Sequence, residues 1–286
     1  MAELRIGTCS WKFPSWHGLV YSAPRGINYL QEYASHYTTV EIDQWFWSLF
    51  GESIRLPDTE DAQAYRRSVP DDFRFTVKAP NSITLSHLRT PKGEPLVANP
   101  HFLSPSLFET FLARLDPLRD VLGPVMFQFE YLNRNKMPSQ ERFQALFEAF
   151  AQQLPGSYLY GVETRNGSYL NASYFQFLAR NRLIPVLLQG YWMPPVVGIY
   201  ERWGAYLAQQ QMVVVRLHGP DRQEIEEETG KQWDQIVAPR DQELGAIVSM
   251  VQELVDHGVD VYLNVNNHYE GSAPRTIERI RRLLQP

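Results

Sequence analysis

The sequence predicts an α/β fold, a single parallel (β/α)8 barrel of the TIM type that occupies residues 1–286 as one domain. Three observations lead to this prediction. Short apolar runs typical of strands recur along the whole chain, segments with helical spacing separate them, and no linker or low-complexity stretch divides the chain. Because one-domain α/β barrels commonly reach about 250 residues or more, the length fits one barrel as well as two smaller domains, and the alternation favours the barrel.

Eight runs rich in β-branched and aromatic residues are expected to form the strands. They are residues 4–8, 38–43, 73–79, 125–130, 159–165, 184–189, 212–218 and 259–266. Segments between them repeat apolar residues every three or four positions, which is the spacing of an amphipathic helix. The clearest are residues 106–122, 140–153 and 242–257, and the first two of these follow Ser104 and Ser139, which are typical helix caps.

Two connections are longer than the others, residues 80–103 and 219–239. Both follow predicted strands, so both are expected on the carboxyl-terminal face, where barrels of this type keep their active sites. Connections above about 15 residues in a compact domain are commonly functional, and we predict that these two act as lids. The acidic cluster at residues 224–228 is interpreted as a solvated face.

Composition excludes several classes of protein. Hydrophobic residues make up 44% and charged residues 21% of the chain, as in an ordinary globular protein. The most apolar stretch, residues 183–200, contains three prolines and lacks the ~20 uninterrupted apolar residues of a membrane span. Cys9 is the only cysteine, so no internal disulfide forms, and no signal peptide is evident. We therefore expect a soluble, cytoplasmic protein with no membrane partner, and the net charge of −5 disfavours nucleic acid as a partner.

Strand alternation predicts a ring of polar side chains inside the barrel. Residues two apart share a face, and the outer face must be apolar to pack against helices. In residues 40–43 the outward positions are Val40 and Ile42, so Glu41 and Asp43 point inward. The same reasoning directs inward the side chains of Lys78, Gln128, Glu163, Arg165, Gln189, Arg216, His218, Asn264 and Asn266.

This ring has two interpretations, because burying a charge without a partner is costly. It is either a salt-bridge layer that serves only the fold or a ligand-binding site, and its repetition at seven strand ends favours the site. Aromatic residues follow the same strands, among them Phe13, Trp16, Phe46, Trp47, Tyr191 and Trp192. We expect Trp11 and Trp45 to contact a ligand with hydroxyl or phosphate groups and a flat face, such as a sugar or nucleobase, although each aromatic residue alone is more typical of packing.

The residue types in the ring suggest acid and base chemistry. Glu41 and Glu163 are the predicted acid and base, with His218 and Lys78 as further catalytic residues. Arg165 and Arg216 are expected to hold an anionic group together with Lys78. The ligand-binding set is completed by Asp43, Gln128, Gln189, Asn264 and Asn266. The sequence thus predicts a hydrolase, lyase or isomerase that acts without a cofactor on a small phosphorylated, acidic or sugar-like molecule.

Two alternatives remain open. The first is a metal-dependent phosphodiesterase or endonuclease acting on nucleic acid, with a divalent metal as cofactor, but His218 is the one histidine at a strand end and such sites require several ligands. The second is a non-catalytic ligand-binding or scaffold protein. Cys9 near the end of the first strand is either a nucleophile or, as is more typical of a lone buried cysteine, a packing residue.

Seven motifs at these positions resemble the YecE-like family, TIM-barrel proteins named for domain of unknown function 72. They are IGTCSW at 6–11, WHGLVYS at 16–22, VEID at 40–43, VPDDFRFTVKAPNSIT at 69–84, VETRN at 162–166, RLHG at 216–219 and NVNN at 264–267. The resemblance implies the barrel fold and no established reaction. The sequence departs from the family pattern at the rim, where Asp43 replaces a common Asn and where Glu130 and Tyr131 replace two prolines.

Overall fold

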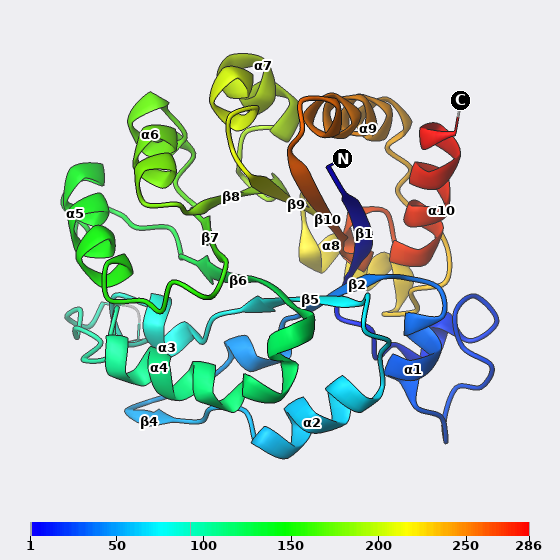
Figure 1. The fold of residues 1–286 in the computed structure, drawn as a ribbon, viewed down its shortest axis with the longest axis horizontal. Helices are drawn as coiled ribbons and strands as arrows, with labels where there is room; N and C mark the ends of the chain where they lie inside the picture. Colours follow the sequence, from blue (N-terminus) through cyan, green and yellow to red (C-terminus); the bar gives the residue numbers. More distant parts are fainter. Residues whose placement is uncertain (1, 92, 286) are drawn as a thin grey trace.

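The computed structural model describes residues 2–91 and 93–285. Its centre is a closed barrel of parallel strands in the order β1-β10-β9-β8-β7-β6-β5-β2, and helices form a ring around it (Figure 1). The strands are β1 Leu4–Cys9, β2 Thr39–Ile42, β5 Arg74–Lys78, β6 Leu122–Gln128, β7 Tyr160–Glu163, β8 Ile184–Gly190, β9 Met212–Gly219 and β10 Asp260–Val265. The predicted parallel barrel is confirmed, and each of the eight predicted runs overlaps one of these strands.

Most helices connect successive strands and cover the outside of the barrel, whereas α8 lies at its carboxyl-terminal end and α10 follows the last strand (Figure 1). They are α1 Tyr29–Ala34, α2 Thr59–Arg67, α3 Asn81–Thr84, α4 Pro105–Arg114, α5 Gln140–Ala151, α6 Ala172–Arg180, α7 Val196–Leu207, α8 Arg222–Thr229, α9 Asp241–Asp256 and α10 Ala273–Leu284. The predicted helix at 106–122 is divided into α4 and the 3-10 helix Asp116–Val121. Pro117 explains the division, because proline has no amide hydrogen for the helical ladder. The caps are as expected, since Ser104 accepts from the amide of Leu107 and Ser139 from that of Arg142.

Two apolar layers hold the barrel. The larger lies between the outer faces of the strands and the helices. The smaller fills the barrel interior and consists of Met126, Ile184, Val186, Met212, Val214 and Tyr262. All of these except Met126 lie in the amino-terminal half of their strands or in its middle, so the interior is apolar at one end and polar side chains fill the other.

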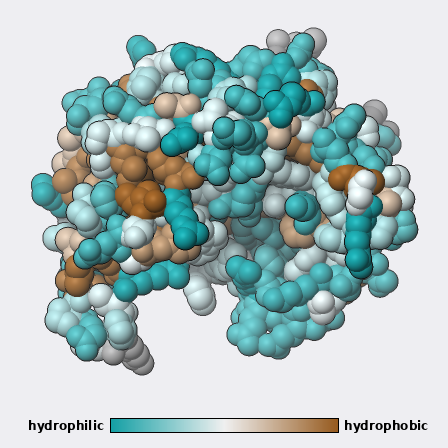
Figure 2. All heavy atoms as spheres, turned by 90° about the horizontal axis from the view of Figure 1, so that it is seen from below, coloured by the Kyte–Doolittle hydropathy of each residue, from teal (hydrophilic) through white to brown (hydrophobic). Residues whose placement is uncertain are grey.

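The two long connections leave β5 and β9 at the carboxyl-terminal end of the barrel. Residues 80–103 contain α3 and an antiparallel bridge between His87 and Ala98, and residues 219–239 contain α8. The interpretation of the acidic cluster as a solvated face is wrong for Glu226, whose side chain is only 18% exposed and contacts His268. In a view from the side, the surface is hollowed between two lobes at its lower edge, and hydrophobic side chains gather on the left-hand lobe (Figure 2).

Within the residues that the structure describes, no helix combines the length and the apolar character needed to cross a membrane.

Candidate functional site

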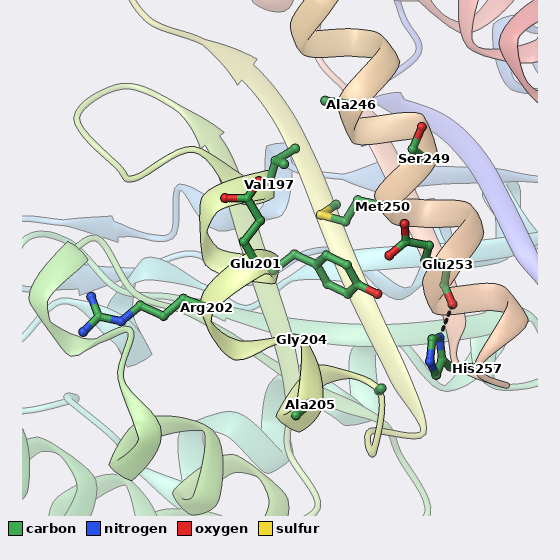
Figure 3. Close-up of a pocket in the computed structure, with 12 residues that line it drawn as sticks. Val197, Glu201, Arg202, Gly204, Ala205, Ala246, Ser249, Met250, Glu253 and His257 are labelled. Atoms are coloured by element: carbon green, nitrogen blue, oxygen red, sulfur yellow. Dashed lines mark hydrogen bonds between the residues drawn. The ribbon is translucent and has the colours of Figure 1, made fainter.

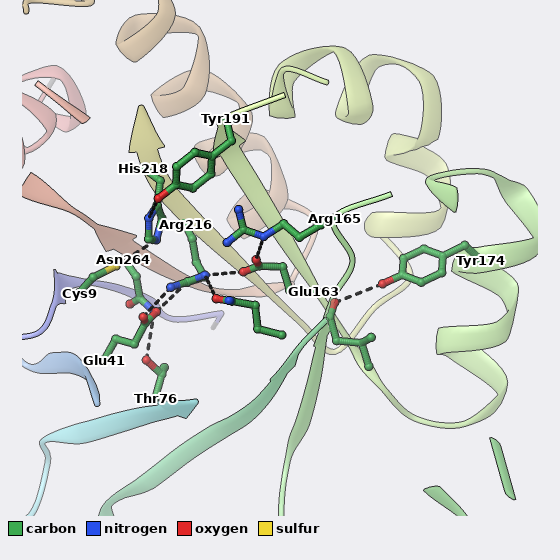
Figure 4. A network of polar contacts seen from close by, with 12 residues as sticks. Cys9, Glu41, Thr76, Glu163, Arg165, Tyr174, Tyr191, Arg216, His218 and Asn264 are labelled. Carbon is green, nitrogen blue, oxygen red and sulfur yellow. Dashed lines mark hydrogen bonds and ion pairs between the residues drawn. The ribbon is translucent and has the colours of Figure 1, made fainter. Parts of the chain in front are cut away.

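Arg216 lies at the centre of the polar ring and joins three other strands (Figure 4). Its Nε and Nη2 atoms donate to the two carboxylate oxygens of Glu41 on β2, at 2.7 and 2.6 Å. Its Nη1 atom donates to the carboxylate of Glu163 on β7 and, at 3.1 Å, to Oε1 of Gln128 on β6. Arg216 and Glu163 are 1% exposed and Glu41 is 0% exposed, so this ion-pair network is closed to solvent.

Neighbouring side chains complete this network. Asn264 on β10 donates to Oε2 of Glu41 at 3.2 Å and to Oγ1 of Thr76 at 3.0 Å. The Nε atom of Arg165 lies 2.7 Å from the second oxygen of Glu163. Each buried carboxylate therefore faces at least one guanidinium, which is the condition under which buried charge is tolerated.

The network fixes the charge of its members. Burial by itself raises the pKa of Glu163, but the charges of Arg165 and Arg216 outweigh burial and bring this pKa below its ordinary value. Burial opposes the charged form of Arg216 as well, yet Glu41 and Glu163 raise the pKa of its guanidinium well above its usual range. Glu163 is thus a carboxylate at neutral pH, and it is unsuited to donate a proton there.

A cavity of about 460 Å³ opens directly above this network, at the carboxyl ends of the strands. Asp43, Lys78, Gln128, Arg165 and His218 line it, whereas Glu41, Glu163, Arg216 and Asn264 do not. Asn266 also lines it, and its side chain accepts a hydrogen bond from the amide of His268. The predicted ring is therefore two layers, a closed ion-pair layer below and a layer open to the cavity above.

Asp43 and Lys78 are the two charged side chains of the upper layer that have no protein partner. In the part of the chain that the structure describes, neither side chain forms a hydrogen bond or an ion pair with another residue. The Nζ atom of Lys78 lies 4.1 Å from the centre of the Phe46 ring. Burial and Arg216 lower the pKa of Lys78, while burial and Glu41 raise the pKa of Asp43. Both pKa values move toward neutrality, which favours proton transfer near neutral pH.

His218 on β9 lies between Cys9 and Tyr191. Its Nε2 atom is 3.7 Å from Sγ of Cys9 and its Nδ1 atom is 3.4 Å from the hydroxyl of Tyr191. Burial and the nearby charges of Arg216, Arg165 and Lys78 lower the pKa of His218 well below 6.5, so the ring is neutral. Burial also raises the pKa of Cys9 well above 9.0, which keeps it a thiol and favours packing over a nucleophilic role.

Two glycines bring the ends of β8 and β9 together and place Tyr191. The amide of Tyr191 donates to the carbonyl of Gly219 at 2.8 Å. A Cβ atom at Gly190 would lie 2.2 Å from that same carbonyl, so only glycine permits this approach. Tyr191 itself has a φ of 53°, and Ser10 across the cavity has a φ of 64°. Such left-handed backbone at non-glycine residues concentrates at functional sites, and both residues line the cavity.

A groove of about 830 Å³ continues from the cavity along the rim. It shares Trp47, Arg165, Tyr191 and Arg222 with the cavity, and Tyr131 and Trp192 line it further out. Trp47 is 53%, Tyr131 64% and Trp192 96% exposed, which is unusual for aromatic side chains in a protein without a partner. The groove offers flat apolar surface next to charged groups.

The predicted orientation of Gln189 is wrong. Its amide donates to Glu243 on α9 at 2.8 Å and its carbonyl accepts from the amide of Val196 at 2.8 Å, so it points outward between helices. Ile184 and Val186 of the same strand occupy the interior, and Gln189 is out of phase with them. Because β8 is apolar on both faces, its sequence did not indicate which of its residues point into the barrel.

The structure does not bring Trp11 and Trp45 to the cavity or the groove. Both pack on Tyr65 of α2, at ring distances of 5.0 and 5.4 Å. Their neighbours Phe46 and Trp47 line the cavity instead.

One side of the cavity is lined by charged residues of the connection 219–239 that sequence reasoning did not place in the site. Glu226 on α8 forms ion pairs with Arg222 at 2.6 Å and Lys231 at 3.3 Å, and contacts His268 at 3.2 Å. The one signal for them was the length of the connection 219–239 after a strand.

Other parts of the molecule offer less chemistry. Among residues 2–91 and 93–285, no group of three or more His, Cys, Asp or Glu side chains is placed to hold a metal ion. A separate pocket of about 560 Å³ lies on the outer surface between α7 and α9 (Figure 3). Its one imidazole, His257, contacts the carbonyl of Glu253 in its own helix at 2.6 Å.

The chain is similar to proteins without an assigned reaction. The family described as "Protein of unknown function DUF72" matches residues 5–286. The UPF0759 protein YecE of Escherichia coli K12 is 31% identical over 165 residues, which are 57% of this chain and 49% of YecE. The match therefore spans about half the length of this curated relative.

Two solved structures are similar over nearly the whole chain. A DUF72 family protein of Enterococcus faecalis V583 has a TM-score of 0.69 and 20% identity, with 99% of this chain and 96% of that chain covered. A DUF72 family protein of Thermotoga maritima MSB8 has a TM-score of 0.67 and 21% identity, with 99% and 100% covered. At these identities the likeness supports the barrel fold.

Replacing Glu163 by Gln should destabilise the protein by roughly 3 kcal/mol, because Arg165 and Arg216 lose a buried counter-charge. The matched control is Glu148→Gln, which breaks the exposed pair with Arg180 and should cost at most about 1 kcal/mol. Urea unfolding at pH 7 measures both. Since the folded-state pKa of Glu163 lies below the ordinary 4.5, its contribution is complete above pH 4.5 and disappears as the pH falls through the lowered value. Equal losses in the two variants would contradict the buried network.

The His218 ring should remain neutral at pH 6, because its folded-state pKa lies well below 6.5. Nitrogen-15 NMR of the imidazole measures its protonation directly. An unfolded chain protonates this histidine below pH 6.5, so stability should decrease as the pH falls below that value, and His218→Asn should reduce the decrease. The exposed His257 provides the comparison within the same spectrum. A protonated His218 at pH 6 would rule out a neutral imidazole in the site.

Proposed function

The chain belongs to the DUF72 family, which names no reaction, and from the geometry of the site we propose that it is an enzyme for a small anionic molecule. The molecule binds in the cavity at the barrel mouth, and protons are transferred to and from it there. The observation that carries the proposal is the pair Asp43 and Lys78, whose ionisable groups lie at strand ends and face the cavity without a hydrogen bond or ion pair to another described residue. A polar group without a partner in an enclosed site is costly, and a ligand that forms hydrogen bonds with it offsets that cost.

Arg165 is the proposed anchor for the anionic group. Glu163 holds its Nε atom, and the two terminal nitrogens form no hydrogen bond within the described residues. Its guanidinium carbon lies 4.8 Å from the centre of the Tyr191 ring, which fixes the plane of the group. A guanidinium held in this way can bind a carboxylate or phosphate through two parallel hydrogen bonds. Lys78, Arg222 and Lys231 also line the cavity and increase its positive charge.

Asp43 and His218 are the proposed acid and base. The raised pKa of Asp43 favours a protonated carboxyl that can donate, and the lowered pKa of His218 favours a neutral ring that can accept. Glu41 and Glu163 were the acid and base that the sequence suggested. Their burial beneath the cavity and their pairing with Arg216 support a structural role in its place, in which they hold Arg216 and Arg165.

The aromatic groove supports a ligand with a flat or apolar portion. Tyr191 and Arg165 belong to both the cavity and the groove, so a ligand anchored at Arg165 can extend over Tyr191 toward Trp47 and Trp192. Sugars and aromatic rings both stack on such surfaces. The arrangement therefore favours a molecule with an anionic end and a flat end.

Arg165→Gln should weaken the binding of inorganic phosphate by about tenfold or more, because charged hydrogen bonds contribute about 1.5 to 3 kcal/mol. Arg180→Gln, which removes an exposed arginine paired with Glu148, should leave the affinity unchanged. Isothermal titration with phosphate at constant ionic strength measures both, and thermal unfolding checks that each variant is folded. Phosphate affinity that is the same in a folded Arg165→Gln variant and in the wild type would remove Arg165 from the proposed site.

A screen of small phosphorylated and acidic substrates with and without a chelator separates this proposal from a metal-dependent phosphodiesterase. Acid and base catalysis by Asp43 and His218 should be unchanged by EDTA. Hydrolysis of nucleic acid that EDTA abolishes and a divalent metal restores would favour the phosphodiesterase. Binding of phosphate without turnover of any substrate would favour a binding protein.

A further inference from the structure

We propose that Lys78 acts as a nucleophile that forms an imine with the substrate, so the substrate carries an aldehyde or ketone as well as its anionic group. This inference rests on the proposed function, since it assumes a ligand in the cavity above Arg216. It extends that function from proton transfer to covalent catalysis at one named atom, Nζ of Lys78.

Position is the first argument. Lys78 is the last residue of β5, so its backbone is fixed by pairing with β6, where it faces Met126. Its side chain lines the cavity, and no carboxylate lies within ion-pair distance of Nζ among the described residues. Two other lysines do form ion pairs, Lys136 with Glu130 at 2.5 Å and Lys231 with Glu226 at 3.3 Å. The amine of Lys78 is therefore available to a ligand.

Charge is the second argument. A lysine is nucleophilic only as the neutral amine, and an apolar or positively charged neighbourhood favours that form. Below Lys78 lies the guanidinium of Arg216, and burial together with this charge lowers the pKa of the lysine despite Glu41 and Asp43. The ring of Phe46, 4.1 Å from the amine, provides no hydrogen-bond acceptor, and its attraction for an ammonium opposes the shift, as Glu41 and Asp43 do.

The groups around Lys78 can supply each proton that imine formation requires. The neutral amine attacks the carbonyl carbon, and the carbonyl oxygen takes a proton from the Asp43 carboxyl. His218 takes one proton from the nitrogen, which leaves a neutral amino alcohol. His218 then returns this proton to the hydroxyl, which leaves as water while the nitrogen lone pair forms the C=N bond. The product is a protonated imine beside the Asp43 carboxylate, and the water carries away the protons from Asp43 and His218. The imine then withdraws electrons from the neighbouring carbon, which is the usual purpose of such an intermediate.

Reductive trapping tests the inference directly. The protein is incubated at pH 7 with glyoxylate, which combines an aldehyde and a carboxylate, and with cyanoborohydride, which reduces only the imine. The chain contains five lysines, so peptide mass spectrometry can assign every adduct. We expect Lys78 to be modified at least about tenfold faster than the exposed Lys12, because a bound aldehyde is held beside the amine. Excess phosphate should slow the reaction at Lys78 and leave Lys12 unaffected.

Two variants complete the experiment. Lys78→Arg keeps the positive charge and should abolish the fast adduct while it retains phosphate binding in the titration. Lys12→Arg, at an exposed position, is the matched control and should not change the fast adduct. Modification of Lys78 no faster than Lys12 in a protein that binds phosphate would overturn the imine and leave the anion site intact. A protein that neither binds phosphate nor traps glyoxylate at Lys78 would contradict both proposals.

Discussion

The guanidinium of Arg216 is a permanent positive charge in the middle of a barrel, and the polar half of the interior is arranged around it. The bidentate pair with Glu41 ties β9 to β2, and the contacts with Glu163 and Gln128 tie it to β7 and β6. An uncompensated guanidinium at this depth would destabilise the fold by several kcal/mol. The buried carboxylates and the arginine therefore stabilise one another, and none of them is available to react with a ligand.

This closed layer determines what the open layer can do. Glu41 forms an ion pair with Arg216, and Glu163 forms one with Arg165. The charges of this layer shift the pKa of each cavity residue above it differently. Burial is the largest cause of the pKa shifts of Lys78, His218 and Asp43, and charges of the network add to it. Arg216 further lowers the pKa of Lys78 and His218, and Glu41 further raises that of Asp43. Burial and the network together thus move an acid, a base and an amine toward the neutral forms that catalysis at pH 7 requires. A simpler apolar layer would fill the barrel equally well but would shift these pKa values by burial alone.

Much of this arrangement was accessible from the sequence, and the missing parts have physical reasons. Alternation on β2, where Val40 and Ile42 must pack outward, places Glu41 correctly, because each residue type has one tolerable side. Alternation did not predict the orientation of Gln189, because the preceding residues of β8 are apolar on both faces and do not indicate which face points into the barrel. Pairing across the barrel was also inaccessible, because Glu41 and Arg216 are 175 positions apart and several carboxylates were equally eligible partners. Trp11 and Trp45 were misplaced because their partner, Tyr65, lies on a helix outside the barrel.

The division between strands and loops suggests how substrate choice and chemistry are separated in this protein. Lys78 and His218 lie within strands, and Asp43 directly follows one, so the proposed reacting groups are held by the hydrogen bonds of the sheet. The aromatic groove is built from Trp47, Tyr131 and Trp192, which lie in connections and are mostly exposed. Connections tolerate substitution far better than barrel strands, because few buried contacts depend on them. Of the departures from the family pattern in this sequence, Tyr131 falls at such a rim position, whereas Asp43 lies at a strand end. We therefore expect the rim to select which anionic molecule enters, while the strand ends determine what happens to it.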